Sequence, residues 1–450
     1  MLTLSESATL LNSRCSGQDV TFTSVTTDSR NIEAGTLFVA LRGDRFDGHD
    51  FVTQALRDGA VAAMVEEGVD LPRDTNSDSL LHVADTRRAL GDLARHWRSR
   101  FDIPVIGVSG SNGKTTVKEM IAAILRAHYG QEHVLATTGN LNNDIGVPLT
   151  LLRLRPAHQA AVIELGINHP GETDLLAGYT QPTVALINNA QREHQEFMKS
   201  VADVAREHAD LFRHLTDKGI AVINADDHYV DLWRDAARSH RVITFGINDK
   251  ADVSAAYQLN ELGAELDLTC DQTHTHVSLQ AVGLHNVRNA AAAAAATYAA
   301  GIEPLAIKAG LESFTPVKGR MQRRAARDGS MIIDDTYNAN PDSVRAAIDV
   351  LATMKSPRIL VLGDMGEVGD QGQAFHTEIG QYAQKVGIEV IYTLGELSKA
   401  STEAFGANAA HFTDVEALLT SLEQHLPDHP TFLIKGSRFM RMERIVDKIT

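Results

Sequence analysis

A glycine-rich turn that runs directly into Lys114, Thr115 and Thr116 is the part of this sequence whose residue types and spacing most clearly indicate chemistry. An apolar run at 103–108, which predicts a buried strand, precedes the turn, and a helical pattern follows it. Glycines let consecutive backbone N–H groups point at phosphate oxygens, and a helix N-terminus adds the positive end of its dipole. The lysine can reach the β- and γ-phosphates, and the Thr115 hydroxyl can bind Mg²⁺. The pattern therefore predicts a nucleoside triphosphate site.

This turn departs from the strict phosphate-loop pattern G-x-x-x-x-G-K-S/T. That pattern places a glycine at position 108, where this chain has Val108. The alternative is a chance glycine-rich turn before a helix. Because strand, glycines, Lys-Thr and helix come in the required order, we predict a variant phosphate loop. The residues expected to bind the nucleotide here are Gly110, Ser111, Asn112, Gly113, Lys114, Thr115 and Thr116.

Three further side chains are candidate metal ligands. Glu164 ends an apolar run, His194 follows the next one in a polar loop, and His208 lies a few turns further on an expected helix. Open α/β sheets bind ligands at the ends of their strands, where a carboxylate and an imidazole could hold Mg²⁺ between the nucleotide and an acceptor. The alternatives are a helix-capping or ion-paired carboxylate for Glu164 and an ordinary loop histidine for His194.

Two later segments are also rich in polar groups. His285 and Asn286 stand at an expected helix start, where Asn286 could cap the helix or its amide could bind an adenine edge; the sequence leaves both open. Arg320 lies in an expected linker, from which it could enter the nucleotide site when domains close, or simply remain solvated. A cluster before Pro341 holds more polar groups than a simple turn requires, namely Asp334, Asp335, Tyr337, Asn338 and Asn340.

The elements that must position these residues predict an α/β protein with three domains. At 450 residues the chain exceeds one hydrophobic core. We place a small α/β domain at 1–82, a central domain with a mainly parallel sheet at 83–315, and a doubly wound, Rossmann-like domain at 316–450. Apolar runs at 160–165, 183–187, 220–223 and 242–245 alternate with helical patterns, and three alternating runs between 255 and 280 indicate an antiparallel extension of the central sheet.

Composition narrows the class of protein. The formal net charge of −16 opposes binding to nucleic acid or to an anionic membrane surface, so a phosphate-bearing substrate needs local basic groups. The two cysteines show no metal-ligand spacing, which suits a reducing compartment. The N-terminus has no signal-peptide pattern, and no apolar run approaches the roughly 20 residues of a membrane span. We expect a monomeric cytoplasmic enzyme.

Taken together, these motifs resemble the Mur ligase family, and the resemblance covers essentially the whole chain. The segments TTDSR, GTLFVALRG and DGHDF look like its UDP-binding domain, and GSNGKTT and ELGINHPGE look like its ATP domain. Four narrower segments point to the member that adds a dipeptide, namely TTGNLNNDIGVPLTLL, DDTYNANPDS, LGDMGEVG and KGSRFMRME. The resemblance implies that ATP, with Mg²⁺, activates the carboxylate of UDP-N-acetylmuramoyl-tripeptide as an acyl phosphate, which the amine of D-Ala-D-Ala then attacks.

The same resemblance implies roles for the residues. Lys114 and Thr115 would serve phosphate and Mg²⁺, Glu164 and His194 would hold metal, His285 and Asn286 would lie at the adenine, Asp335 at the ribose and Arg320 at the γ-phosphate. The residues implied for the UDP end are Ser29 and Arg30, and those for the muramoyl-peptide are Thr138, Asn140 and Asn143. The residues implied for the dipeptide are Asn338, Asn340, Lys435, Ser437 and Arg438.

Other functions also fit parts of the sequence. Within the enzymes, the alternatives are the family member that adds the third amino acid and a folylpolyglutamate synthase. The YNANP segment and the absence of a DNPR motif weigh against the former, and the UDP-domain motifs weigh against the latter. A nucleotide-gated binding protein without ligase activity is a third alternative, which the intact Lys114, Glu164, His194 and Arg320 oppose.

Position 208 departs from the family pattern. It aligns with a lysine that many Mur ligases carry as a carbamate beside a second Mg²⁺. His208 cannot carry a stable carbamate, but a neutral ring nitrogen can bind a metal. Alternatively, His208 only packs on its helix. In both cases we expect one negative charge to be missing beside the second metal, so that Mg²⁺ affinity depends on Glu164 and His194.

Overall fold

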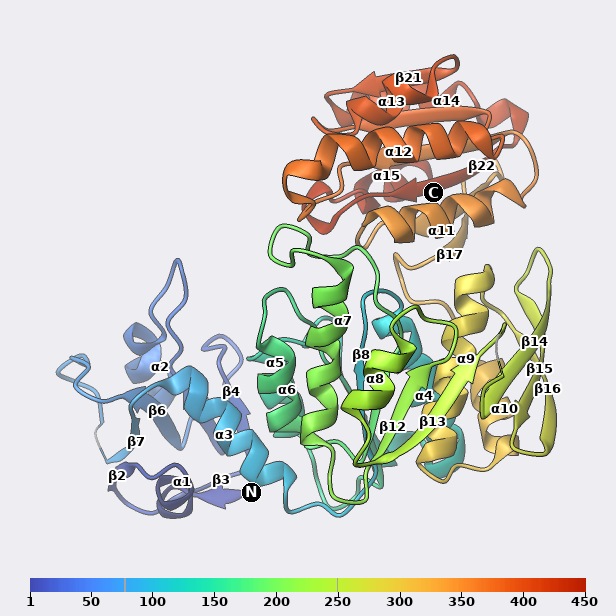
Figure 1. Ribbon diagram of the computed structural model, residues 1–450. Coiled ribbons are helices and arrows are strands. Elements are labelled where there is room, and N and C mark those ends of the chain that lie inside the picture. Colours follow the sequence, from blue (N-terminus) through green and yellow to red (C-terminus); the bar gives the residue numbers. More distant parts are fainter. Residues whose placement is uncertain (77, 249) are drawn as a thin grey trace.

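The strands of this chain form three main sheets, and each sheet draws its strands from one of the three predicted segments. The computed structural model describes residues 1–76, 78–248 and 250–450. In Figure 1 the N-terminal part (blue) lies beside the central part (cyan to yellow), and the C-terminal part (orange to red) lies above the central part. On this basis we propose domain boundaries near residues 83 and 316.

The N-terminal domain holds a five-stranded sheet in the order β2-β7-β6-β5-β4 and a small β1–β3 pair. Its strands are β1 (Leu2–Thr3), β2 (Arg14–Gly17), β3 (Thr21–Phe22), β4 (Ser24–Thr26), β5 (Thr36–Val39), β6 (Ala62–Glu66) and β7 (Ser79–Val83). Its helices are α1 (Leu4–Leu10), η1 (Gly48–Phe51) and α2 (Val52–Arg57). Strands β3 and β4 follow each other closely in the chain, but β3 pairs with β1 while β4 joins the larger sheet.

The central domain is built on nine strands in the order β16-β15-β14-β13-β12-β11-β8-β10-β9. They are β8 (Val105–Ser109), β9 (Val134–Ala136), β10 (Ala160–Glu164), β11 (Val184–Ile187), β12 (Ile220–Asn224), β13 (Arg241–Gly246), β14 (Val253–Leu259), β15 (Ala264–Cys270) and β16 (Thr273–Leu279). Strands β8 to β13 pair in parallel, and β14, β15 and β16 form the predicted antiparallel extension. The prediction of a mainly parallel sheet is confirmed.

Helices cover both faces of the central sheet (Figure 1). They are α3 (Thr86–Arg98), α4 (Lys114–Tyr129), η2 (Gln131–His133), α5 (Gly146–Leu151), α6 (Glu172–Thr180), α7 (Val201–Ala209), η3 (Asp210–His214), α8 (Val230–Ala236), α9 (Leu284–Ala299) and α10 (Pro304–Ser313). The alanines of α9 from Ala290 to Ala296 are fully buried with α4 and the strands of one face. Small side chains let these elements approach closely, so the alanine run is a packed core helix.

The order of the strands explains where the site lies. After β8 the chain passes to β9 and β10 on one side, and then returns to β11 on the other side of β8. Loops that leave β8 and its neighbours in opposite directions open a crevice at the carboxyl ends of the strands, which is the usual ligand site of an open α/β sheet. The phosphate loop follows β8, Glu164 ends β10, and His194 follows β11.

The C-terminal domain has six strands in the order β17-β18-β22-β19-β20-β21, of which only β17 is antiparallel. The strands are β17 (Gln322–Ala325), β18 (Met331–Asp335), β19 (Arg358–Gly363), β20 (Val390–Leu394), β21 (Ala409–Phe412) and β22 (Thr431–Lys435). The helices are α11 (Pro341–Ala352), η4 (Gly369–Gln371), α12 (Gly372–Lys385), α13 (Lys399–Phe405), α14 (Val415–Glu423), η5 (Leu426–Asp428), η6 (Arg438–Met440) and α15 (Glu443–Ile449).

Two apolar clusters, one on each face of this sheet, form the core of the C-terminal domain. The doubly wound architecture is therefore confirmed. Arg320 lies between α10 and β17, and β17 pairs with β18 as an edge strand. No helix in the described part of the chain is long and apolar enough to cross a membrane.

Candidate active site

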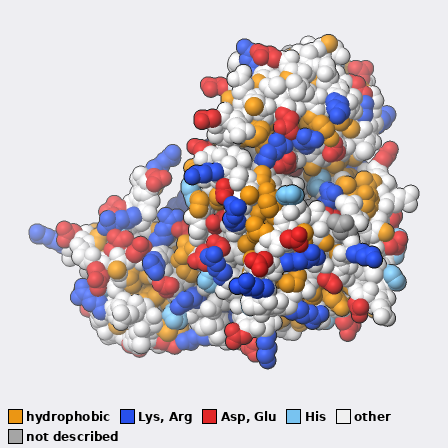
Figure 2. Space-filling model, in the orientation of Figure 1, with side chains coloured by type: hydrophobic (Ala, Val, Ile, Leu, Met, Phe, Trp, Pro, Cys, Tyr) orange, Lys and Arg blue, Asp and Glu red, His pale blue; other side chains and the backbone are white. Residues whose placement is uncertain are grey.

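A cavity of about 890 Å³ lies between the central and C-terminal domains. In Figure 2 the boundary between these domains is hollowed, and Lys, Arg and His side chains lie along it. The predicted residues that line the cavity are Ser111, Asn112, Gly113, Lys114, Thr115, Thr116, Asn143, Glu164, His194, His285, Asn286, Arg320, Asp335, Asn338, Asn340, Lys435, Ser437 and Arg438. Segments from two domains therefore meet at one site.

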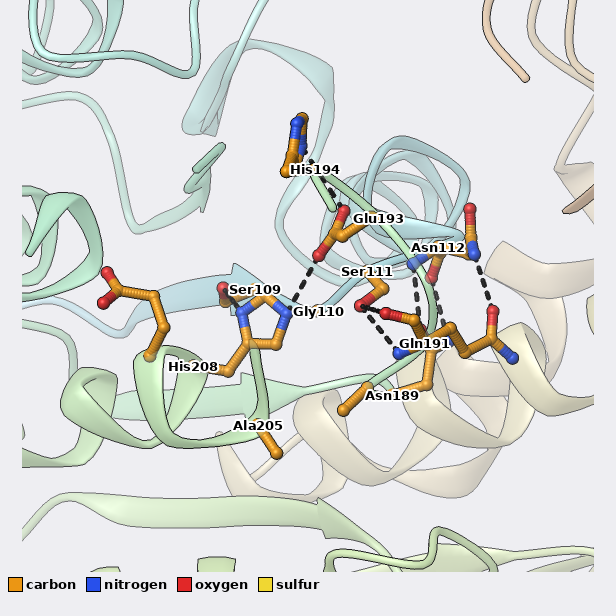
Figure 3. Close-up of polar contacts among 12 residues, drawn as sticks. Ser109, Gly110, Ser111, Asn112, Asn189, Gln191, Glu193, His194, Ala205 and His208 are labelled. Atoms are coloured by element: carbon orange, nitrogen blue, oxygen red, sulfur yellow. Dashed lines mark hydrogen bonds and ion pairs between the residues drawn. The ribbon is translucent and has the colours of Figure 1, made fainter. Parts of the chain in front are cut away.

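The phosphate loop has the predicted strand–turn–helix geometry. Strand β8 ends at Ser109, helix α4 begins at Lys114, and Gly113 between them has a φ of 84°. A Cβ atom at Gly113 would lie 2.4 Å from Oδ1 of Asn289, so this position requires glycine. The backbone N–H groups of Ser111 and Asn112 donate to Asn189, which fixes the loop on the segment after β11 (Figure 3).

The ammonium group of Lys114 lies inside this loop. Its Nζ donates to the carbonyl oxygens of Gly110 at 2.5 Å and Ser111 at 3.2 Å, and lies 3.4 Å from Oε2 of Glu193. The first-turn N–H groups of α4 have no partner within the helix. Together they offer positive charge and donors to an anion, as a phosphate site requires.

Glu164 and Thr115 meet at the end of β10. The Thr115 hydroxyl donates to Oε1 of Glu164 at 3.1 Å, and Nδ2 of Asn142 donates to the same oxygen at 2.8 Å. The other carboxylate oxygen, Oε2, is buried and has no hydrogen-bond partner in the described residues. An unsatisfied buried carboxylate oxygen beside a hydroxyl is a donor set that suits Mg²⁺.

No group of three or more His, Cys, Asp or Glu side chains within the described ranges is arranged to hold a metal ion by itself. Mg²⁺ usually keeps several waters and binds through one or two carboxylates together with substrate phosphates. The residues present therefore fit a metal that arrives with a nucleotide.

His194 lies between the two domains. Its Nδ1 is 2.6 Å from Oε2 of Glu367 in the C-terminal domain, and its Nε2 is 3.6 Å from Oε2 of Glu193. This close contact with His194 lowers the pKa of Glu367. His194 also has a φ of 48°, which is uncommon for a residue other than glycine.

His208 does not line the cavity. It lies on α7, is fully buried, and its ring connects Oγ of Ser109 to Oε1 of Glu193 (Figure 3). Both ring nitrogens therefore have protein partners. The ring is therefore held by hydrogen bonds as well as by packing on α7, and whether it also binds a metal stays a prediction.

The residues expected at the adenine lie at the start of α9. Asn286 does not cap this helix: Gly283 is its N-cap residue, and Nδ2 of Asn286 donates to the Val282 carbonyl at 2.9 Å. Its Oδ1 accepts from Asn289. Desolvation lowers the pKa of His285 to about 4, so this ring is neutral at pH 7.

The C-terminal domain brings basic groups to the cavity. Asp335 and Lys435 are register partners at the ends of the parallel strands β18 and β22, and their side chains form a 2.5 Å ion pair. The guanidinium of Arg320 stacks on the Tyr337 ring at 4.1 Å and has no carboxylate partner in the part of the chain that the structure describes. Arg438 lies 5.9 Å from the same ring and pairs with Glu443. Arg320 is thus a cation available to an anionic ligand.

Several predicted dipeptide residues also hold the domain itself together. Asn340 caps α11 in a capping box and exchanges amide hydrogen bonds with Asn112 of the phosphate loop, at 2.9 and 3.3 Å. The Ser437 hydroxyl donates to the Ala339 carbonyl, and Lys435 donates to the Asn338 carbonyl at 2.8 Å. Asn340 therefore joins the phosphate loop to the C-terminal domain.

Five predicted residues besides His208 lie outside the cavity lining, namely Ser29, Arg30, Gly110, Thr138 and Asn140. Arg30 is exposed on the N-terminal domain and pairs with Asp28. Thr138 accepts a hydrogen bond from Arg153, while Asn143 binds the N–H of Gly146 just before α5. Of the residues predicted for the UDP end and the muramoyl-peptide, only Asn143 lines the cavity that holds the phosphate loop.

Several residues of the cavity were not predicted from the sequence. Glu193 could have been identified from the sequence, because it is an acidic residue directly before His194, a candidate metal ligand. Asn142 lies beside the predicted Asn143, and Tyr337 is in the polar cluster already noted. Glu367 could not be found, because only domain packing brings it to His194.

Family models of three Mur ligase domains each match one segment of the chain. They are described as Mur ligase family, catalytic domain, at 21–98, Mur ligase middle domain at 108–297, and Mur ligase, glutamate ligase domain, at 319–438. The UDP-N-acetylmuramoyl-tripeptide--D-alanyl-D-alanine ligase of Escherichia coli (strain K12) is 42% identical over 451 residues, which cover 99% of this chain and 97% of that protein.

Solved structures of MurF enzymes share the fold of this chain over almost its whole length. Crystal structure I of MurF from Acinetobacter baumannii has a TM-score of 0.92 at 35% identity and covers 100% of this chain and 98% of its own. MurF ligase from Thermotoga maritima in complex with ADP has a TM-score of 0.83 at 27% identity, covering 95% of this chain and 96% of its own. Because the domain models match in order and the relatives are covered almost end to end, this chain belongs to the Mur ligase family.

Proposed function

We propose that this chain is an ATP-dependent ligase that joins D-alanyl-D-alanine to UDP-N-acetylmuramoyl-tripeptide. One observation carries the proposal: the phosphate loop faces Arg320 and Lys435 of the C-terminal domain across a single cleft, in a chain that matches enzymes of this activity over its full length. The products are UDP-N-acetylmuramoyl-pentapeptide, ADP and phosphate, so the enzyme makes a precursor of peptidoglycan.

The chemistry needs two steps because a carboxylate has no good leaving group. A carboxylate oxygen of the tripeptide attacks the γ-phosphorus of ATP, the bond to the bridging oxygen breaks, and ADP leaves. The amine of D-Ala-D-Ala then attacks the carbonyl carbon of the acyl phosphate, loses a proton, and phosphate departs. Positioning and charge neutralisation contribute most of the catalysis in such reactions.

Residues of the cleft can meet these requirements for positioning and charge neutralisation. Lys114 and the first turn of α4 receive the phosphates, and Arg320, stacked on Tyr337, neutralises the transferring group. The neutral His285 and Asn286 receive the adenine, and Asp335 the ribose. Lys435, Arg438 and Ser437 lie on the C-terminal side, where the carboxylate of the incoming dipeptide would bind.

Mg²⁺ fits beside the nucleotide. Thr115, Glu164 and His194 would hold it, because Oε2 of Glu164 lacks any other partner in the described residues. When bound, Mg²⁺ would neutralise phosphate charge and polarise the γ-phosphoryl group. Thr115 and Asn142 orient the Glu164 carboxylate for this purpose through hydrogen bonds to its other oxygen.

The remaining proposals concern the UDP-linked acceptor, the oligomeric state, the absence of a nucleic acid partner and the cellular compartment. Ser29 and Arg30 on the N-terminal domain would meet the UDP end, and Thr138, Asn140 and Asn143 the muramoyl-peptide. Two domains of the same chain supply the groups of the cleft, and we propose that a monomer is sufficient for activity. The net charge of −16 argues against a nucleic acid partner, and the free thiols of Cys15 and Cys270 suit a reducing cytoplasm.

Phosphate release tests the proposal. We expect release from ATP and Mg²⁺ only when UDP-N-acetylmuramoyl-tripeptide and D-Ala-D-Ala are both present, with mass spectrometry showing the pentapeptide product. Single amino acids in place of the dipeptide should support little release. Turnover with a single amino acid, or release that ignores the acceptor, would contradict the assignment.

A further inference from the structure

The carboxylate of Glu193 is a charged group in the wall of the cleft that the mechanism above does not use. It is only 6% exposed, lines the cavity, and has three nitrogen-bearing neighbours. Its Oε2 is 3.4 Å from Nζ of Lys114. The same oxygen is 3.6 Å from Nε2 of His194, and Oε1 is 3.1 Å from Nε2 of His208 (Figure 3). The ammonium group of Lys114 and the two imidazole rings surround this buried carboxylate, and such neighbours stabilise its ionised form.

His208 is a hydrogen-bond partner of this carboxylate. Because an ionised carboxylate only accepts hydrogen bonds, the Nε2 atom of His208 must carry a proton and donate it to Oε1. The opposite nitrogen, Nδ1, bonds Oγ of Ser109 at 3.0 Å, at the end of β8. The ring is fully buried between these two partners, so β8 fixes the orientation of Glu193 through His208.

Nucleotide binding changes the surroundings of Glu193. Lys114 now contacts the carbonyls of Gly110 and Ser111 as well as Glu193, but a phosphate-loop lysine turns to the phosphates when a nucleotide binds. The carboxylate would then stand beside phosphate oxygens with its main cation withdrawn. His208 would still donate to Oε1, but a buried carboxylate that loses its cation is unfavourable, so the loaded site favours another cation next to Glu193.

We propose that Glu193 is an anionic ligand of the divalent cation that accompanies the nucleotide, and that His208 is the residue that positions it. The inference rests on the proposed ATP-dependent function. A carbamylated lysine at position 208 would carry a negative charge, and in this chain Glu193, from the loop after β11, supplies that charge instead. His208 does not bind the metal in this arrangement, because Ser109 and Glu193 occupy its two nitrogens.

Mn²⁺ binding in the presence of a non-hydrolysable ATP analogue tests the proposal without any peptide substrate. Electron paramagnetic resonance titration of the full chain gives the Kd for Mn²⁺. We expect Glu193→Gln, which keeps the shape and removes the charge, to raise this Kd by about tenfold or more, since loss of a supporting group alone costs 10- to 100-fold in comparable sites. The matched control is Glu196→Gln, an exposed glutamate in the same loop, which should leave the Kd unchanged.

The role of His208 is tested by two variants. His208→Leu removes the donor to Glu193 and should also weaken Mn²⁺ binding, whereas His208→Gln can still donate to the carboxylate and should restore most of the affinity. A merely structural histidine would instead lower the melting temperature in both variants and leave the Mn²⁺ Kd unmoved. These two variants also decide the question if Glu193→Gln does not fold.

An unchanged Mn²⁺ Kd in folded Glu193→Gln, or equal Kd values for His208→Leu and His208→Gln, would overturn the inference. Failure of the proposed function would look different. In that case the wild-type chain would bind Mn²⁺ with the nucleotide analogue and still give no pentapeptide in the ligation assay.

Discussion

Arg192 of the central domain and Asp342 of the C-terminal domain form a two-point ion pair across the cleft. Nη2 of Arg192 lies 2.6 Å from Oδ1 of Asp342, and the Arg192 backbone N–H donates to Oδ2 at 2.9 Å. The same guanidinium contacts Glu378 on α12 at 2.8 Å. Hydrogen bonds from a planar guanidinium group to the two oxygens of a carboxylate are among the stronger ones in proteins. We call these three residues the interdomain latch.

We expect Arg192→Ala to loosen the two domains. Small-angle X-ray scattering without nucleotide should show a larger radius of gyration than the wild type, because Asp342 and Glu378 lose their partner in the other domain. Arg213→Ala is the control, since Arg213 is exposed and its ion pairs stay within the central domain. Identical scattering profiles for Arg192→Ala and the wild type would show that the latch does not set the domain arrangement.

The latch should weaken in acid. The hydrogen bond from Arg192 lowers the pKa of Glu378 below its ordinary value of 4.5. A carboxylate whose pKa is lowered by its partner stabilises the paired state above the ordinary pKa, and this stabilisation is lost as the pH falls below about 4.5. The difference in melting temperature between the wild type and Glu378→Gln should therefore shrink from neutral pH toward pH ~4. A difference that stays constant over this range would contradict the assignment.

The Lys114→Ala variant should lose at least ~10²-fold in ligation rate, the range seen when one preorganised electrostatic group is removed. The backbone of the phosphate loop stays anchored through Asn189, so nucleotide binding should persist in equilibrium dialysis. Lys399→Ala, which removes an exposed lysine of the C-terminal domain, is the control. Near-normal ligation by Lys114→Ala would refute the role of this lysine.

Bicarbonate should not stimulate the wild-type enzyme. Position 208 is a histidine, which forms no stable carbamate, and its ring is already bonded to Ser109 and Glu193. Rates of pentapeptide formation in carbon dioxide-depleted buffer should equal those after bicarbonate is added back. His208→Ala should raise the Mg²⁺ concentration needed for half-maximal rate while ATP still binds. Stimulation of the native chain by bicarbonate would sink this interpretation.

The sequence by itself determined the local parts of the site. The phosphate loop could be predicted because its function depends on a contiguous backbone: a strand, glycines that adopt positive φ, and a helix that begins at Lys114. Alternating strand and helix patterns likewise predicted two doubly wound domains, since hydrophobic periodicity is a property of neighbouring residues. Full-length motifs indicated the family.

Only the tertiary structure decided which side chains meet. Glu193 contacts His208, fifteen positions further along the chain, and Arg192 contacts Asp342, 150 positions away. Asn286 could have capped a helix or faced the cleft, and the packing of α9 removed the first option. Such contacts depend on the strand order around β8 and on how two domains pack together. A pattern of residues along the sequence contains no information on strand order or on domain packing. The polar partners of the phosphate loop could therefore be identified only from the folded structure.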